Sequence, residues 1–389
     1  MSNKKIKTRA LIFLGLVVLA IVIIILALSI RNHNLPGADL SSATVEIVPI
    51  ATGNVHSMAI TQDGSLWIWG SGVGAQLGND TTTNQLYPMQ AMEDIASIAS
   101  NTGEIAFSRG NTHVMALTSS GTLLTWGADI REFQRTSRSY GRLINNLTAP
   151  VEIMRNVTQI STGGSNALAI TSDGALWSWG ERPTTIKEDV IFVSRGRNHT
   201  MAITSDGALW GWGSNSNGQV GSGENEGWNT FIPDHTRIMT DVIYVSAGSS
   251  HTMAITSDGI LWGWGNNSSG QLGDETTAAR FDPTKIIEDV VKVSSGSSHT
   301  MAITSDGTLW GWGGNSLGQL GDGTRVNHSS LIRIMDNVAI VSAGAFHTMA
   351  VTTDGMLWTW GGNGYGQLGD GTTEDSNIPI RIMDGIMLP

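Results

Sequence analysis

The chain has 389 residues, a formal net charge of −11 and no Cys. The lack of Cys excludes disulfides and thiolate metal sites, so the fold must depend on packing and strand hydrogen bonds. Charged residues make up only 14%, whereas 48 Gly and 14 Trp indicate many turns and large buried aromatic groups.

The acidic charge lies after the N-terminal region. Five of the 22 basic residues precede Asn32 and no acidic residue does, so the remainder carries 17 basic and 33 acidic residues, a net charge of −16. A domain this acidic repels phosphate backbones. We therefore expect no nucleic-acid partner.

The first predicted element is a membrane-spanning helix at residues 10–30, a stretch without charge that is mostly Leu, Ile and Val. At roughly 1.5 Å per residue it crosses a bilayer, and the basic residues 1–9 indicate a cytoplasmic N-terminus. An uncleaved signal anchor is favoured, with cleavage after a small-residue motif at residues 27–29 as the alternative, which would make the protein secreted. Either way we expect the remainder to be extracytoplasmic, beginning with a linker at residues 31–44.

Residues 45–389 contain a sequence repeat of which residues 251–265, HTMAITSDGILWGWG, are the clearest copy. A spacing of about 50 residues between copies is typical of propeller or solenoid arrays. Seven copies begin at His56, His113, Asn166, His199, His251, His299 and His347.

Each repeat predicts four β-strands. A β-branched run ending in Gly-x-x-His gives the first strand, and residues 199–204 alternate with the period of two that a second strand requires. Asp206-Gly207 predicts a hairpin turn to a third strand at residues 209–213, and residues 236–239 indicate a fourth.

The predicted fold is all-β: a seven-bladed β-propeller of four-stranded blades, preceded by the N-terminal transmembrane helix. Closure into a ring removes exposed sheet edges. The array begins at residues 45–53, which predict a first strand, and ends at residues 378–386, which predict a fourth strand. We therefore expect both termini to complete the last blade.

The repeat resembles the regulator of chromosome condensation family. The resemblance rests on Gly-x-x-His, Ala-Ile-Thr-Ser-Asp-Gly, Leu-Trp-Gly-Trp-Gly and Asn-x-x-Gly-Gln-Leu-Gly, best seen at residues 296–321 and 344–369, and extends over about 340 residues. It implies a seven-bladed propeller, here in a bacterial-type membrane-anchored member. The family includes a nuclear nucleotide-exchange factor for the small GTPase Ran, and a secreted bacterial inhibitor of β-lactamases has a similar propeller, so the fold alone does not select a function.

The repeated histidines predict a structural role, because a catalytic cleft has no use for six copies of one base. We expect each side chain to fix its Gly-x-x-His turn by a hydrogen bond, a role that Asn166 also fits. A ring of metal-binding histidines is the alternative, but single residues one blade apart lack the clustered spacing of zinc sites. We expect neither metal nor cofactor. The structural set is His56, His113, His199, His251, His299 and His347.

The residues that break the repeat are the candidates for binding. Blade two has an Arg-rich loop in place of the usual Asn-x-x-Gly-Gln-Leu-Gly, blade three nearly lacks this loop, and blade four extends it. Two long loops beside a short one predict a notch lined by a basic patch with aromatic anchors, since Arg and aromatic residues are frequent in binding hot spots. Solvated loops that vary without function are the alternative. The predicted binding residues are Arg109, Arg131, Phe133, Arg135, Arg138, Tyr140, Arg142, Arg195, Arg197 and Trp228.

Three classes of function remain. No hydrolase elbow, phosphate loop or zinc-protease motif occurs, so we expect no enzyme activity and no catalytic residue. The leading prediction is a membrane-anchored binding module that presents its propeller face to a protein or glycan outside the cytoplasm, with inhibition of a secreted enzyme as a subtype. Guanine-nucleotide exchange on a small GTPase is implied by the resemblance alone, and an extracellular carbohydrate-active enzyme has only the weak hint of Glu224 and Glu226.

Overall fold

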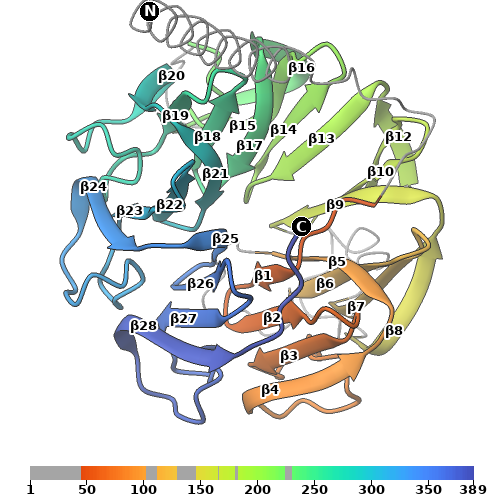
Figure 1. Ribbon diagram of the computed structural model, residues 1–389. Coiled ribbons are helices and arrows are strands. Elements are labelled where there is room, and N and C mark those ends of the chain that lie inside the picture. The colour runs from red at the N-terminus through yellow and green to blue at the C-terminus, as the bar shows by residue number, and fades with distance from the viewer. Residues whose placement is uncertain (1–44, 102–111, 129–145, 165, 180–182, 224–229) are drawn as a thin grey trace, which may run out of the picture. The chain divides into compact units, whose positions relative to one another are not determined.

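Seven antiparallel sheets of four strands each are arranged as the blades of a ring in the computed structural model (Figure 1). This arrangement confirms the predicted all-β, seven-bladed propeller. The structure describes residues 45–101, 112–128, 146–164, 166–179, 183–223 and 230–389.

Blades one to four take consecutive sets of four strands. Blade one has β1 (Ile50–Thr52), β2 (His56–Ile60), β3 (Leu66–Gly70) and β4 (Gln85–Met92). Blade two has β5 (Ile95–Ser100), β6 (His113–Thr118), β7 (Leu123–Ala128) and β8 (Asn146–Met154). Blade three has β9 (Val157–Gly163), β10 (Asn166–Thr171), β11 (Leu176–Trp179) and β12 (Pro183–Lys187). Blade four has β13 (Val190–Arg195), β14 (His199–Thr204), β15 (Leu209–Ser214) and β16 (Phe231–Met239).

The remaining blades are the most regular. Blade five has β17 (Val242–Ala247), β18 (His251–Thr256), β19 (Leu261–Gly265) and β20 (Arg280–Ile287). Blade six has β21 (Val290–Ser295), β22 (His299–Thr304), β23 (Leu309–Gly313) and β24 (His328–Met335). Blade seven has β25 (Val338–Ala343), β26 (His347–Thr352), β27 (Leu357–Gly361) and β28 (Ser376–Met383).

The predicted Asp-Gly hairpin joins the second and third strands of a blade. In blade four, Gly207 has φ of 76°, a conformation that Gly adopts without strain. The carboxylate of Asp206 accepts hydrogen bonds from the Thr204 hydroxyl and the Ala208 amide. Thr-x-Asp-Gly therefore specifies the turn through local hydrogen bonds as well as backbone freedom.

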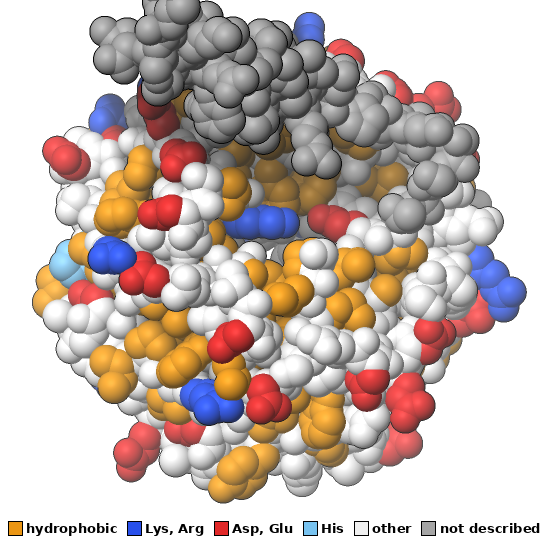
Figure 2. Space-filling view, in the orientation of Figure 1, with side chains coloured by type: hydrophobic (Ala, Val, Ile, Leu, Met, Phe, Trp, Pro, Cys, Tyr) orange, Lys and Arg blue, Asp and Glu red, His pale blue; other side chains and the backbone are white. Residues whose placement is uncertain are grey.

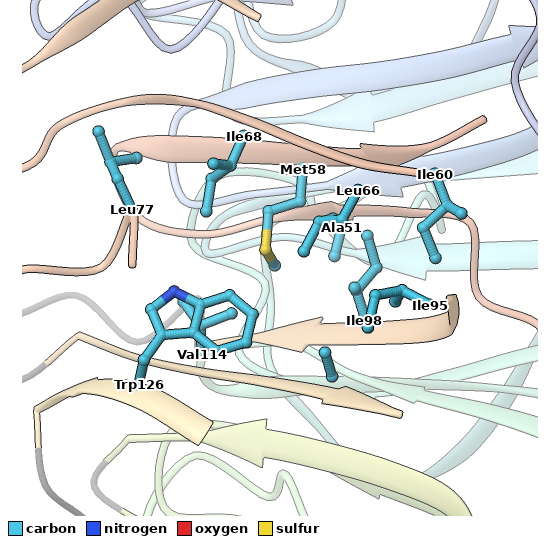
Figure 3. Close-up of a cluster of buried hydrophobic side chains, with 11 residues drawn as sticks. Ala51, Met58, Ile60, Leu66, Ile68, Leu77, Ile95, Ile98, Val114 and Trp126 are labelled. Atoms are coloured by element: carbon cyan, nitrogen blue, oxygen red, sulfur yellow. The ribbon is translucent and has the colours of Figure 1, made fainter. Parts of the chain in front are cut away.

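The hydrophobic core lies between neighbouring blades. Figure 3 shows the cluster between blades one and two, where Met58 and Leu66 face Ile98 and Trp126. All four side chains are buried. Similar clusters lie between further pairs of blades, and the second strand is accordingly buried on both faces.

Ring closure differs from the prediction in one respect. The last blade consists of β25 to β28 alone, and the C-terminal tail instead contacts the first blade. Ile386 pairs with Thr61 as an isolated antiparallel bridge, and the Met387 amide donates to the Ile60 carbonyl at 2.9 Å. The reason is that β1 is only three residues long, so Ile386 fills the strand position before it, as Val190 does opposite Thr204 in blade four.

The predicted membrane span at residues 10–30 and linker at 31–44 lie outside the described residues. Among the residues that are described, no helix has the length and apolar character to cross a bilayer.

Candidate functional site

The repeated histidines lie between blades, fully buried. In blades four to seven, the Nε2 atom of each histidine contacts a hydroxyl on the second strand of the next blade at 2.8 to 3.0 Å. The pairs are His199–Thr252, His251–Thr300, His299–Thr348 and, across the ring closure, His347–Ser57. These side-chain bonds connect blades and do not fix the turn in which each histidine lies.

The Gly-x-x-His turn is instead closed by the backbone. The amide of Gly248 donates to the carbonyl of His251 at 2.9 Å, and the same bond recurs in other blades. A Cβ at Gly248 would lie 2.4 Å from His251 Cε1, which is too close for any side chain. Gly is therefore required because the imidazole packs directly on its backbone.

Burial fixes the charge and tautomer of these histidines. The Thr252 hydroxyl donates its one hydrogen to the Gln219 carbonyl at 2.7 Å, so it accepts from His199, whose Nε2 must carry the proton. Burial, the Arg195 charge and His251 together lower the pKa of His199 to about 3. The histidine is thus neutral and suited to a structural bond rather than to acid–base catalysis at neutral pH.

We call the junction between two neighbouring blades a joint. Each regular joint centres on one Gln carbonyl. In the joint between blades four and five, the Gln219 carbonyl accepts from both the Thr252 hydroxyl and the Trp264 indole N–H, at 2.7 and 3.0 Å. The Gln belongs to the Asn-x-x-Gly-Gln-Leu-Gly loop of the preceding blade. The carbonyls of Gln271, Gln319 and Gln367 likewise each accept from one hydroxyl and one indole N–H of the next blade.

The joint between blades three and four departs from this pattern. Asn166 replaces the histidine, and only residues 180–182 connect β11 to β12, so blade three has no Gly-Gln-Leu-Gly loop. Trp212 is partly exposed, whereas its equivalents Trp264 and Trp312 are completely buried. The short loop therefore leaves one face of this tryptophan uncovered.

Arg195 occupies part of the space that the missing histidine would fill. Its Nη1 donates to the Thr200 hydroxyl, the group that a histidine bonds in the regular joints. Its Nε is shielded from solvent and has no partner. Burial lowers the pKa of Arg195 to about 10, so the guanidinium stays charged at neutral pH.

A cavity of about 730 Å³ opens at this joint. Trp212 forms one wall, with His235 against it in an edge-to-face contact at 4.5 Å between ring centroids. Phe231, 63% exposed, lines the cavity as well. Its other lining residues include Asn166, Leu168, Ile186, Arg195, Asn198 and Thr200. The cavity combines aromatic and apolar walls with a partly buried cation, which suits binding of a polar group on an apolar support.

The structure describes two of the predicted binding residues. Arg195, at the end of β13, points into the joint, and Arg197 lies partly buried on the turn to β14. None of the ion pairs within the described ranges includes either arginine. The other predicted binding residues lie outside the described residues: Arg109, Arg131, Phe133, Arg135, Arg138, Tyr140, Arg142 and Trp228.

Sequence reasoning placed a notch at blade three and named Arg195, but it missed Thr200 and Trp212, which also line the cavity. Thr200 and Trp212 occupy ordinary positions of the repeat, so nothing in their own sequence context indicates a binding role. Thr200 stays buried and Trp212 is partly exposed, and both lack the Gln carbonyl that the loop of the preceding blade provides in the regular joints. Pairing each blade with the loop of the preceding blade would have identified both.

A second group of polar residues lies in the central channel, where Figure 2 shows a hollow with basic and acidic side chains. Burial raises the pKa of Glu46, while Gln159 and Lys292 counteract this shift. Burial and the Glu46 charge raise the pKa of Tyr244, which also contacts Phe192 at 4.8 Å between ring centroids. These groups interact with one another, so the joint with its unpaired donors is the stronger candidate site.

Comparison with known proteins gives the family. Residues 181–387 match the RCC1-like domain, and residues 63–117 and 157–181 match the regulator of chromosome condensation (RCC1) repeat. The chain is similar to two Arabidopsis thaliana proteins, the mitochondrial RCC1 domain-containing protein RUG3 (31% identity over 237 residues, 58% of this chain and 44% of RUG3) and the ultraviolet-B receptor UVR8 (29% over 236 residues, 59% and 43%). The matches thus span less than half the length of these relatives.

Solved structures show the same fold. The chain is similar to yeast RCC1 (Prp20) in complex with Kap60, with a TM-score of 0.70, 20% identity and coverage of 88% of each chain. Human WBSCR16 gives a TM-score of 0.69 at 20% identity, covering 82% of this chain and 94% of that one. Since the RCC1-like domain matches more than half of its residues, this chain belongs to the regulator of chromosome condensation (RCC1) repeat family.

Proposed function

We propose that this propeller is a non-catalytic binding module, anchored in a membrane by residues 10–30, that presents one face to a protein or glycan outside the cytoplasm. The single observation that carries the proposal is the cavity between blades three and four, where Arg195 and Trp212 are left without the loop that closes a regular joint. Binding sites commonly form where loops vary on a rigid scaffold.

The binding face is the one on which β13 turns into β14 and β15 leads toward β16. Asn198 on the first connection and Ser214 and Phe231 at the ends of the second all line the cavity. In the chain after residue 31, which carries a net charge of −16, a basic site would attract an acidic group on the partner.

The partner is identified by crosslinking capture on the native cell surface. Replacing Arg197 on this face with Ser should reduce capture of the partner, because the substitution removes a positive charge beside the cavity. Arg237→Ser is the matched control, since this exposed arginine lies on the outer strand β16. Equal capture by both variants and the unmodified chain would argue against this face.

Orientation is tested by adding protease to intact cells. We expect the propeller to be digested from outside, because the basic residues before the predicted span favour a cytoplasmic N-terminus. Detergent-permeabilised cells provide the control for total digestibility. Protection in intact cells and digestion only after permeabilisation would place the propeller in the cytoplasm and rule out the proposed location.

A further inference from the structure

The joint between blades three and four keeps the hydrogen-bond donors of a regular joint. Thr200 pairs with Trp212 across β14 and β15, as Thr252 pairs with Trp264 across β18 and β19. The hydroxyl and the indole N–H therefore occupy equivalent places in the two blades. In the regular joint both donate to the Gln219 carbonyl.

The acceptor of these two donors is missing in the irregular joint. Blade three has no loop glutamine, and within the described part of the chain neither the Thr200 hydroxyl nor the Trp212 indole donates to a protein acceptor. Buried or half-buried donors without an acceptor cost free energy, so an oxygen atom supplied from outside would bind favourably here.

Arg195 adds a charge that the regular joints lack. Blades five and seven have Ala247 and Ala343 at the same strand position, opposite Thr252 and Thr348. The Arg195 guanidinium bonds Thr200, and its Nε has no partner. An anionic oxygen would satisfy this unpaired cation as well as the two neutral donors, and charge-assisted hydrogen bonds are the stronger ones.

The position and the lining of the cavity favour a peptide. In the regular joints a turn of polypeptide fills this space, and its leucine side chain, such as Leu272, is completely buried. The cavity keeps apolar walls at Leu168 and Ile186, where an apolar part of a peptide would pack.

We propose that this joint binds an acidic peptide turn of a partner protein, whose carboxylate accepts hydrogen bonds from Trp212, Thr200 and Arg195. The proposal rests on the proposed function and specifies its ligand: the partner is a protein, and the recognised group is an Asp or Glu side chain. The carboxylate oxygen takes the place that the Gln carbonyl holds in the regular joints.

The test is an NMR titration of the full-length chain in detergent micelles, with ¹⁵N-labelled tryptophan. Trp212→Phe assigns the Trp212 indole signal. The probes are acetyl-Gly-Asp-Gly-amide, its uncharged analogue acetyl-Gly-Asn-Gly-amide, and glucuronate. We expect the Asp peptide to shift this signal saturably, at about tenfold lower concentration than the Asn peptide because its hydrogen bonds are charge-assisted.

Internal and matched controls accompany the titration. The Trp264 signal should not move, because its N–H is already bonded to Gln219. Arg195→Ala, the residue of blades five and seven at this position, should raise the half-saturating concentration of the Asp peptide about tenfold or more. Arg237→Ala, at the exposed control position on β16, should leave it within about twofold, and thermal unfolding verifies that both variants fold.

Three outcomes would overturn the proposal: equal binding of the Asp and Asn peptides, binding of glucuronate without the Asp peptide, which would assign the joint to an acidic glycan, or no shift of Trp212 with any probe. Failure of the joint and failure of the proposed function remain distinguishable. If the Asp peptide binds but no partner is captured on cells, the function is wrong and the joint stands. If a partner is captured on cells but the Asp peptide does not bind, the proposed function stands and the proposal for the joint is wrong.

Discussion

At the scale of single residues, one hydroxyl connects two blades. Thr300 accepts a hydrogen bond from His251 of blade five and donates one to Gln271 of the same blade, at 3.0 and 2.8 Å. The repeat keeps both His and Thr because each satisfies a buried polar group of the other. Blade two has Val114 and blade three Ala167 at the hydroxyl position, and His113 Nε2 correspondingly has no partner.

We expect Thr300→Val to lower the free energy of unfolding by about 1–3 kcal/mol, because it leaves the buried His251 N–H without an acceptor. Val is close to Thr in shape and already occupies this strand position in blade two. Chemical denaturation provides the measurement. Thr277→Val, at an exposed loop position, is the control and should change stability by less than about 0.5 kcal/mol. Equal effects of the two substitutions would mean that the bond contributes nothing.

The buried histidines also predict a pH dependence. Burial lowers the pKa of His56, His113 and His251 to about 4, below the usual value of 6.5. The unfolded chain therefore takes up protons first as the pH falls, and stability present above pH 6.5 is lost between pH 6.5 and 4, by up to about 1.4 kcal/mol per pH unit for each histidine. Urea unfolding at pH 7.5, 6 and 5 measures this loss, and His113→Asn should make the slope shallower. A midpoint independent of pH would contradict the account.

At the scale of the element, the Gly-Gln-Leu-Gly loop of a regular blade contacts the tryptophan of the next blade. Its final glycine packs on the tryptophan of the next blade: a Cβ at Gly321 would lie 2.7 Å from Trp360 Nε1. Gly323, two residues later, has a similar φ of +83° but only one atom near a Cβ, Ile378 Cγ2 at 4.0 Å. Both glycines suit the backbone, but only Gly321 is required by its neighbour.

This pair separates backbone strain from packing. We expect both Gly321→Ala and Gly323→Ala to carry the strain of a positive φ, about 1 kcal/mol, and Gly321→Ala to lose about 1–3 kcal/mol more through its contact with Trp360. The difference between the two melting temperatures measures the contact. Similar melting temperatures would show that Trp360 shifts freely to admit a methyl group.

The strands and turns were predictable because each repeat determines them locally: alternation gives β14, and Asp206-Gly207 gives its hairpin. The contacts between blades were not, because periodicity does not indicate which residue of the next blade a side chain meets. The bond from His199 to Thr252 crosses from one blade to the next. The bond from Arg195 to Thr200 lies within blade four and replaces the contact that a histidine of the preceding blade makes in a regular joint. The loop deletion in blade three could be read from the sequence, but the donors that it leaves without an acceptor belong to blade four.

At the scale of the whole molecule, the ring closes through a seventh joint and the C-terminal tail. The His347–Ser57 bond and the Trp69 bond to Gln367 complete the seventh joint, and Ile386 of the C-terminal tail is buried against blade one. The prediction was right that the N-terminal segment gives a first strand and the C-terminal segment a fourth strand. It was wrong that both termini complete the last blade, because the C-terminal tail pairs with blade one. The short length of β1 determines which blade the tail joins, and a repeat pattern does not predict that length.

We expect Ile386→Ala to reduce the free energy of unfolding by about 2–5 kcal/mol, because the side chain is fully buried at the closure. Ile378→Ala is the matched control, since Ile378 is 56% exposed, and should change stability by about 0.5 kcal/mol or less. Denaturant unfolding of the full-length chain compares them. A small effect at Ile386 would show that the ring closes without its tail.

The entry of the chain into the propeller has a mechanical consequence. The Glu46 amide bonds the Thr158 carbonyl of blade three, the Val48 carbonyl accepts from Ile98 of blade two, and the Pro49 carbonyl accepts from Ile60 of blade one. A pulling force on the preceding residues is therefore divided among three blades before it reaches β1. Such an arrangement resists the peeling of one strand at a time, so the chain enters the propeller at a point that is braced against tension.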